Sequence, residues 1–366
     1  MKYFILAGEA SGDKQAALLC ASIYKYDSHA ILKGWGGEAM SENLVEVTKH
    51  YRDLAFMGFV EVIKHLPVIF KNFRLCKNEI MEFQPDALIL VDYPGFNLRM
   101  ASWAFKKKIP VYYYISPQLW AWHTSRVHKI RQAVRRMYVI LPFEQAFYKK
   151  YNVDALYIGH PLAKGIRELN ESFIQMKPGS IALLPGSRKH EIELILPEMA
   201  GLAKLLPDFT FNVVCVQHIP VSIYREIIGD QKNISLVDGK MQMILQESEA
   251  AIVTSGTATL ETALIGTPQV VVYKGNPLSY RIAKRLVKVP YISLVNLIVA
   301  KELVPELIQD QCNALTMKHH LLEILKPEKN QIIRKGYEEI QHTLLSGGGP
   351  DAAAEDIVQN LTRLKG

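Results

Sequence analysis

The sequence predicts an α/β protein made of two domains, each built around a parallel β-sheet. Short apolar runs alternate with helical patterns along the chain, which is typical of strand–helix–strand units. The alternation restarts after Gly159-His160-Pro161, so it forms two series. A length of 366 residues also suits two domains of about 150–200 residues better than one. We therefore expect two Rossmann-like halves that face each other across a central cleft.

The first half, assigned to residues 1–165, is expected to carry four buried strands. They lie at residues 3–7, 87–91, 111–115 and 137–141. These runs are almost continuous in Val, Ile, Leu and Tyr, as parallel strands covered by helices on both faces should be. Helical patterns between them fall near residues 15–26, 59–82, 97–107 and 125–136.

The second half, assigned to residues 178–345, repeats this arrangement. Its strands are expected at residues 180–184, 211–216, 250–253 and 269–273. A glycine-rich breaker at residues 346–350 then precedes Asp351, which can cap a last amphipathic helix over residues 350–366. This helix is expected to dock on an N-terminal domain, either of its own chain or of a partner in a homodimer.

The composition excludes several classes of protein. Apolar residues make up 49% and charged residues 22%, which excludes a disordered chain, a collagen-like repeat or a long coiled coil. The four cysteines form no CxxC pair, so we expect a reducing compartment and neither a disulfide framework nor a structural zinc site. No apolar run reaches about 18 residues, so no spanning helix is expected. A net charge of +7 favours anionic partners: phosphates, anionic lipid or nucleic acid.

Two polar turns follow strands of the first half. The turn Gly8-Glu9-Ala10-Ser11-Gly12-Asp13 places Glu9 and Ser11 where a ligand rich in hydroxyls would bind, although a turn with Ser11 or Asp13 as a helix cap fits equally well. Asp92 follows the strand at 87–91. It is interpreted either as a general base of raised pKa or as a helix cap.

An aromatic and basic stretch follows the strand at 111–115. Trp120 and Trp122 could form an apolar wall for a sugar or an acyl chain, or could divide between core and surface. The basic run at residues 126–136 could receive a phosphate or lipid headgroups, but a solvated helix face explains most of its charges.

Two turns of the second half indicate a nucleotide diphosphate site. Ser187 and Arg188 follow the first strand, where an arginine can bind a phosphate with two hydrogen bonds, or can lie exposed beside a capped turn. Ser255-Gly256-Thr257 opens a helix after the strand at 250–253, which suits a pyrophosphate, and Glu261 follows on the same helical face, where it could accept ribose hydroxyls. A capped amphipathic helix is the alternative. Neither a Walker loop nor an HExxH pair occurs, and no metal site is expected.

The segment at residues 54–74 is more apolar than a core-facing helix requires. Met57, Val60 and Val68 lie off its core-facing stripe, and basic residues flank that stripe. These three side chains are candidates for contact with an anionic membrane. Alternatively, Pro67 breaks the helix and they pack under a loop.

Taken together, these residues resemble the lipid-A-disaccharide synthase family of glycosyltransferases. Nine motifs match the family in register: GEASGD at 8–13, Met57-Gly58 with Val60-Glu61-Val62, DYPGFN at 92–97, SPQLWAW at 116–122, LPFE at 141–144, GHP at 159–161, LPGSR at 184–188, SGTATLE at 255–261, and Asn296-Leu297. Gly95 departs from the pattern, since some members carry a second Asp there. That departure favours Asp92 as the essential carboxylate.

The resemblance implies a metal-independent, inverting enzyme of GT-B architecture without a cofactor. Its reaction would transfer 2,3-diacylglucosamine from UDP-2,3-diacylglucosamine to 2,3-diacylglucosamine 1-phosphate, at the cytoplasmic face of the inner membrane, and would release UDP. In that scheme Asp92 is the base, Arg188 stabilises the leaving group, and Asn296 joins the substrate-binding residues. Nucleic acid is then not expected as a partner.

Two other functions remain open at this point. A UDP-sugar 2-epimerase would share the fold and the nucleotide site but would act on soluble sugars. A non-catalytic, basic peripheral protein that binds anionic lipid or nucleic acid would have no need of Asp92, Arg188 and Glu261 at three strand ends.

Overall fold

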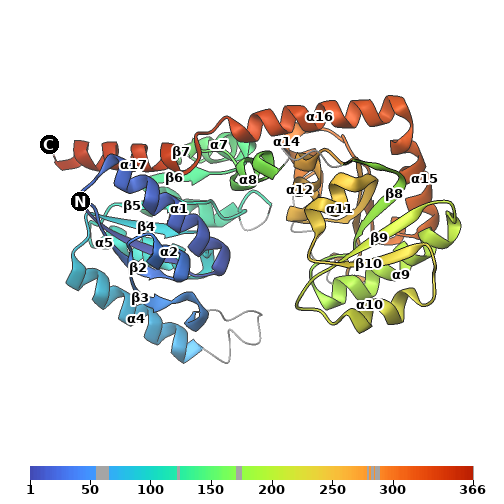
Figure 1. Ribbon diagram of the computed structural model, residues 1–366. Helices are drawn as coiled ribbons and strands as arrows, with labels where there is room; N and C mark the ends of the chain where they lie inside the picture. Colours follow the sequence, from blue (N-terminus) through green and yellow to red (C-terminus); the bar gives the residue numbers. More distant parts are fainter. Residues whose placement is uncertain are drawn as a thin grey trace. The chain divides into compact units, whose positions relative to one another are not determined.

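The computed structural model describes residues 1–54, 66–121, 124–169, 175–277, 280–281, 284 and 289–365. It divides into two compact units. Unit 1 comprises Met1–Pro161 together with Leu344–Gly366, and unit 2 comprises Leu162–Thr343. Each unit holds one parallel sheet with helices packed on it (Figure 1). The expected α/β architecture with two parallel sheets is therefore confirmed.

Unit 1 contains a seven-stranded sheet in the order β3-β2-β1-β4-β5-β6-β7. Its strands are β1 (Lys2–Ala7), β2 (Ile31–Gly36), β3 (Glu46–His50), β4 (Ala87–Val91), β5 (Val111–Tyr114), β6 (Arg136–Val139) and β7 (Ala155–Tyr157). The sequence interpretation missed β2, β3 and β7. The edge strands β3 and β7 are at most half-buried, and β2 contains a lysine and two glycines, so none of the three forms a continuous apolar run.

The helices of unit 1 lie on both faces of this sheet. They are α1 (Ala10–Tyr26), α2 (Glu38–Glu42), α4 (Leu66–Phe83), α5 (Pro94–Lys106), α6 (Val127–Ala133), α7 (Pro142–Lys149) and α17 (Gly349–Lys365). The helix expected over 125–136 is shorter than predicted, because the chain turns extended at Val134 and β6 already begins at Arg136.

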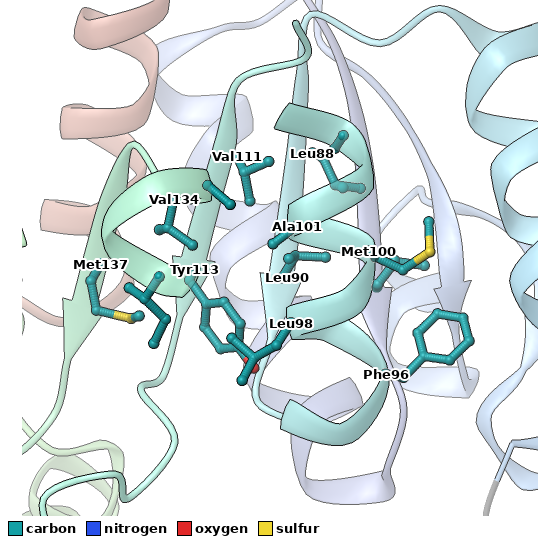
Figure 2. Close-up of a cluster of buried hydrophobic side chains, with 14 of the residues drawn as sticks. Leu88, Leu90, Phe96, Leu98, Met100, Ala101, Val111, Tyr113, Val134 and Met137 are labelled. Carbon is teal, nitrogen blue, oxygen red and sulfur yellow. The ribbon is translucent and has the colours of Figure 1, made fainter. Parts of the chain in front are cut away.

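Successive residues of each strand place their side chains alternately in two hydrophobic cores, one on each face of the sheet. Leu88 and Leu90 of β4 and Tyr113 of β5 pack with Leu98 and the rest of α5 (Figure 2). The intervening residues of the same strands point to the other face, where they pack with α1 and α17. This alternation is the period-two pattern of a strand that is covered on both sides.

Unit 2 contains a six-stranded sheet in the order β10-β9-β8-β11-β12-β13. Its strands are β8 (Lys177–Leu184), β9 (Thr210–Cys215), β10 (Ile234–Asp238), β11 (Ser248–Thr254), β12 (Gln269–Tyr273) and β13 (Glu306–Ile308). Its helices are α8 (Pro161–Leu169), α9 (Lys189–Leu205), α10 (Val221–Ile228), α11 (Met241–Glu247), α12 (Thr257–Ile265), α14 (Leu294–Val299), α15 (Ala314–Leu325) and α16 (Pro327–Leu345). The two edge strands, β10 and β13, were again missed. Among the described residues no helix is both long and apolar enough to cross a membrane.

The last helix, α17, is part of unit 1 and packs against α1 of the same chain (Figure 1). Its apolar side bears Ala353, Ala354, Ile357 and Leu361, all buried in the core beneath α1. Polar contacts fix its ends: Lys25 lies 2.8 Å from Asp351, and Lys365 lies 2.7 Å from Asp86. Exchange of this helix between two subunits stays a prediction.

The chain enters α17 through an obligatory glycine. A Cβ at Gly347 would lie 1.9 Å from the Gly159 nitrogen and 2.0 Å from the Ile158 carbonyl carbon, so no other residue fits there. The Gly349 amide donates to the Ile158 carbonyl at 2.7 Å. The glycine-rich breaker is therefore a close-packed connection to the end of β7.

Truncation of the apolar side of α17 should destabilise unit 1. Ile357→Ala removes a fully buried side chain, and we expect a loss of about 2–5 kcal/mol in the free energy of unfolding. The matched control is Leu364→Ala on the same helix, because Leu364 is 46% exposed and its loss should be nearly neutral. All four tryptophans fall between residues 35 and 122, so tryptophan fluorescence reports unit 1 specifically. Equal stabilities of the two variants would contradict the docking.

Candidate functional site

Most of the sequence-predicted catalytic and ligand-binding residues lie where the strand order reverses in each sheet. In unit 1 the reversal falls between the neighbouring strands β1 and β4, which Glu9 and Asp92 follow directly. In unit 2 it falls between β8 and β11, which are followed by Ser187-Arg188 and by Ser255-Gly256-Thr257. Open α/β sheets bind ligands at such switch points, beyond the carboxyl ends of the strands. Each unit thus has a candidate site of its own.

Asp92 sits in an unusual backbone conformation at the end of β4. It has a φ of 43° and Tyr93 has a φ of 47°, both in the left-handed region that non-glycine residues rarely adopt. Burial, and secondarily the nearby carboxylate of Glu9, raise the pKa of Asp92 to about 6. A half-buried carboxylate of that pKa is largely ionised at neutral pH and more basic than an ordinary one. A carboxylate of this basicity is suited to accept a proton from a ligand.

The two polar turns of unit 1 are in direct contact. The ring of Tyr93 lies so close to Gly8 that a Cβ there would be 2.3 Å from the ring. The Tyr93 hydroxyl also donates to the Leu54 carbonyl at 3.0 Å. GEASGD and DYPGFN therefore form one structural unit, with Glu9 and Asp92 as electrostatic neighbours.

The other polar residues of GEASGD have separate positions. Asp13 is buried, and its carboxylate accepts the amides of Gly37, Ala39 and Met40 at 2.7–3.2 Å. It holds the turn between β2 and α2 and does not cap its own helix, which corrects the capping alternative for this residue. Ser11 is exposed on the first turn of α1, and its side chain makes no capping hydrogen bond.

Glu144 is a buried structural carboxylate that the sequence analysis named only as part of the LPFE motif. It is fully buried, and its carboxylate accepts the indole N–H of Trp120 at 3.0 Å and the amides of Ile140 and Leu141. Burial raises the pKa of Glu144 to about 7. The residue ties the loop after β5 to the start of α7. Trp122, the other half of the proposed aromatic wall, lies outside the described residues.

The turn after β8 is not the open phosphate cradle that the sequence indicated. Glu191 accepts the amides of Ser187 at 3.0 Å and Arg188 at 3.3 Å, and its other oxygen accepts from the Arg188 guanidinium at 2.8 Å. The carboxylate thus fills the place foreseen for a phosphate. The Arg188 side chain is 80% exposed, so its guanidinium still offers donors to a ligand.

The turn after β11 leaves polar groups free for a ligand. Gly256 and Thr257 are exposed at the N-terminus of α12, and the Ser255 hydroxyl donates to the Ile292 carbonyl at 2.9 Å. Glu261 is half-buried and has no hydrogen-bond partner among the residues that the structure describes. Burial raises its pKa. An unpartnered carboxylate one turn from exposed amides suits a ligand with hydroxyls next to a phosphate.

Asn296 is placed beneath this site rather than in it. It is fully buried, its side-chain oxygen accepts the amides of Leu303 and Val304, and its nitrogen donates to Val304 and Glu306. With both ends used, it has no group left for substrate. Glu306 also accepts the amides of Ile292 and Ser293, so the network holds the segment that bonds Ser255.

The membrane candidates are only partly covered by the structure. Met57 and Val60 lie outside the described residues. Val68 is 39% exposed near the start of α4, and Phe70 is 64% exposed on the same helix. In the described part of the chain, no group of three or more His, Cys, Asp or Glu side chains is arranged to hold a metal ion.

Comparisons of structure relate this architecture to solved structures of a glycosyltransferase and an epimerase. A glycosyltransferase of kitacinnamycin matches with a TM-score of 0.68, 12% identity and 98% coverage of both chains. UDP-GlcNAc 2-epimerase from Neisseria meningitidis, bound to UDP-GlcNAc, matches with a TM-score of 0.60, 12% identity and full coverage of both chains. At such identities the likeness concerns the fold, which is the GT-B architecture.

Comparisons of sequence are more specific. The model of the lipid-A-disaccharide synthetase family matches residues 3–349. The lipid-A-disaccharide synthase of Syntrophus aciditrophicus is 38% identical over 99% of this chain and 97% of its own, and that of Geobacter sulfurreducens is 35% identical over 98% and 97%. The chain therefore belongs to the lipid-A-disaccharide synthase family of glycosyltransferases.

Proposed function

We propose that the chain transfers 2,3-diacylglucosamine from UDP-2,3-diacylglucosamine to the 6-hydroxyl of 2,3-diacylglucosamine 1-phosphate. The products are the β-1,6-linked disaccharide 1-phosphate and UDP. The observation that carries the proposal is Asp92, a carboxylate of raised pKa at the switch point of unit 1. The acceptor is proposed to bind at this point, and the donor's UDP at the switch point of unit 2.

The proposed mechanism is a single displacement at the anomeric carbon, which inverts its configuration. Asp92 takes the proton of the acceptor hydroxyl as its oxygen attacks, while the bond from the anomeric carbon to UDP breaks. Arg188 and the free amides at the start of α12 stabilise the negative charge that develops on UDP. Glu261 accepts the ribose hydroxyls. Asp92 and Arg188 follow strands β4 and β8, and Glu261 lies one turn into α12, so regular secondary structure positions the backbone of each group.

Removal of the proposed base should abolish most turnover while the enzyme still binds UDP. We expect Asp92→Asn to lower kcat by roughly 10²–10⁴-fold, because the amide cannot accept the proton, while UDP affinity stays nearly unchanged. Release of UDP from the diacylglucosamine donor measures turnover, and calorimetry measures UDP binding. A folded Asn variant with near-normal kcat would reject the role.

The pH profile gives an independent check on this base. Asp92 acts only when ionised, so kcat/KM, which reports groups of the free enzyme, should fall as the pH falls through about 6. Glu9→Gln removes the neighbouring negative charge and should lower the pKa of Asp92, which moves the acid limb to lower pH. Glu226→Gln, an exposed change on α10 of unit 2, serves as the control and should leave the limb in place. An acid limb that Glu9→Gln leaves unmoved would argue against the coupling of these two carboxylates.

Binding affinities for UDP and for uridine distinguish the residues that contact the ribose from those that contact the phosphates. Glu261→Ala should weaken both ligands alike, because the carboxylate is assigned to the ribose. Arg188→Ala should weaken UDP alone, by about 10–100-fold, which corresponds to about 1.5–3 kcal/mol for a hydrogen bond to a charged group. Glu226→Ala is again the control. If UDP affinity is unchanged in the Glu261 variant, that residue does not bind the ribose.

We infer that the protein lies on the inner face of the inner membrane through the start of α4, since both acylated substrates reside in the bilayer. Val68 and Phe70 are exposed there, beside exposed Lys71 and Arg74. Met57 and Val60, the other two membrane candidates, lie outside the described residues.

Val68→Ser with Phe70→Ser should release the protein from vesicles that contain anionic phospholipid. It should slow turnover on vesicle-borne acceptor but spare a detergent-dispersed assay. Phe105→Ser removes a similarly exposed ring from the end of α5 and should change neither measurement. Equal losses in both assays would indicate a folding defect and would contradict this membrane contact.

A further inference from the structure

We propose that Tyr113 and Asn97 are positioning residues for Asp92, which clamp its backbone carbonyl and so fix the direction of its carboxylate. The inference rests on the proposed role of Asp92 as the base. Neither residue is expected to touch substrate: Tyr113 and Asn97 are both fully buried.

The backbone at Asp92 needs such a clamp because it is strained. Two consecutive non-glycine residues, Asp92 and Tyr93, adopt the left-handed conformation. For both residues this conformation brings the Cβ close to the following carbonyl oxygen and costs energy relative to ordinary backbone. Such a strained pair persists only where contacts with the surrounding structure stabilise its conformation. The question is therefore which contacts hold Asp92 there.

Two donors from different elements converge on the Asp92 carbonyl. The Tyr113 hydroxyl, on β5, donates to it at 2.6 Å, and the Asn97 side-chain nitrogen, on the first turn of α5, donates to it at 2.8 Å. A carbonyl oxygen has two lone pairs, so both are used. Figure 2 shows the Tyr113 ring in the core, between the strands and α5. Burial raises the pKa of Tyr113 well above its ordinary value, so the phenol stays a donor.

Asn97 also grips the two strands that meet at the switch point. Its nitrogen lies 3.1 Å from the Val91 carbonyl at the end of β4 and 3.4 Å from the Leu6 carbonyl in β1. Its side-chain oxygen is buried without a partner in the described part of the chain. Such an orphaned oxygen costs stability, and an apolar residue would avoid the cost. The donor end of the amide accounts for its presence, since it joins β1, β4 and the strained turn at one point.

The clamp has a catalytic consequence. With its carbonyl pinned on both sides, the Asp92 peptide cannot relax to a right-handed or extended conformation, and the carboxylate keeps its place near Glu9. A base must lie within hydrogen-bonding reach of the proton it removes, and a misplacement of about 1 Å can cost on the order of 100-fold in rate. Loss of either hydrogen bond to the Asp92 carbonyl should therefore lower kcat and leave binding of the UDP-sugar unchanged.

The test is Tyr113→Phe, which removes one buried hydroxyl and keeps the ring. We expect kcat to fall by roughly 10–100-fold while the affinity for UDP is unchanged. The acid limb of the pH profile should also move to lower pH, because a relaxed Asp92 is less buried. Tyr114→Phe is the matched control: Tyr114 is the next residue on β5, its side chain packs on the opposite face of the sheet, and kcat should be unchanged.

A double-mutant cycle separates positioning from general destabilisation. Tyr113→Phe should cost nothing further in the Asp92→Asn background, because the hydroxyl acts through that carboxylate. Asn97→Ala serves as a second variant with the same expected pattern, and tryptophan fluorescence verifies that unit 1 is folded. Wild-type kcat in both single variants would overturn the clamp, and so would an equal further loss in the Asp92→Asn background. An active Asp92→Asn enzyme would instead overturn the proposed function itself.

Discussion

The left-handed pair at Asp92 and Tyr93 is the constraint around which unit 1 is organised. Once β4 ends in this turn, the Tyr93 ring crosses the adjacent turn after β1, and a Cβ at Gly8 would stand 2.3 Å from it. The Asn97 amide binds carbonyls of both β1 and β4, and Tyr113 adds a donor from β5. The turns after β1 and β4, together with the Tyr113 side chain of β5, therefore specify one another, and Glu9 and Asp92 lie near each other as a result.

Acidic side chains serve two distinct purposes at the strand ends. Asp13, Glu144, Glu191 and Glu306 each accept backbone amides, and each fixes a loop. A carboxylate is well suited to this, since its oxygens accept several N–H groups at once. Asp92 and Glu261 are the two carboxylates that we propose act on substrate, and burial raises the pKa of both. In this chain, acidic residues of the sequence motifs therefore include structural supports as well as proposed reacting groups.

The fold alone does not choose the reaction. Epimerases and glycosyltransferases share this architecture with the chain at 12% identity, because two parallel sheets with ligand sites at their switch points suit many nucleotide-sugar reactions. The sequence motifs indicate the reaction, since they place particular side chains on the turns at the switch points. The match to one family over residues 3–349 covers both switch points and the approach to the last helix.

The linear pattern of residues was enough to predict the central strands, the two-unit plan and the family. Continuous apolar runs gave β4 and β12 to the residue, because burial on both faces leaves a local signature. Edge strands such as β3 and β7 lack it, since they are less buried. The folded structure was needed to show that Glu191 accepts the amides of the turn after β8, that Asn296 is a support and that Tyr113 holds Asp92. These roles depend on hydrogen bonds between residues that folding brings together, and such pairings leave no periodicity in the sequence.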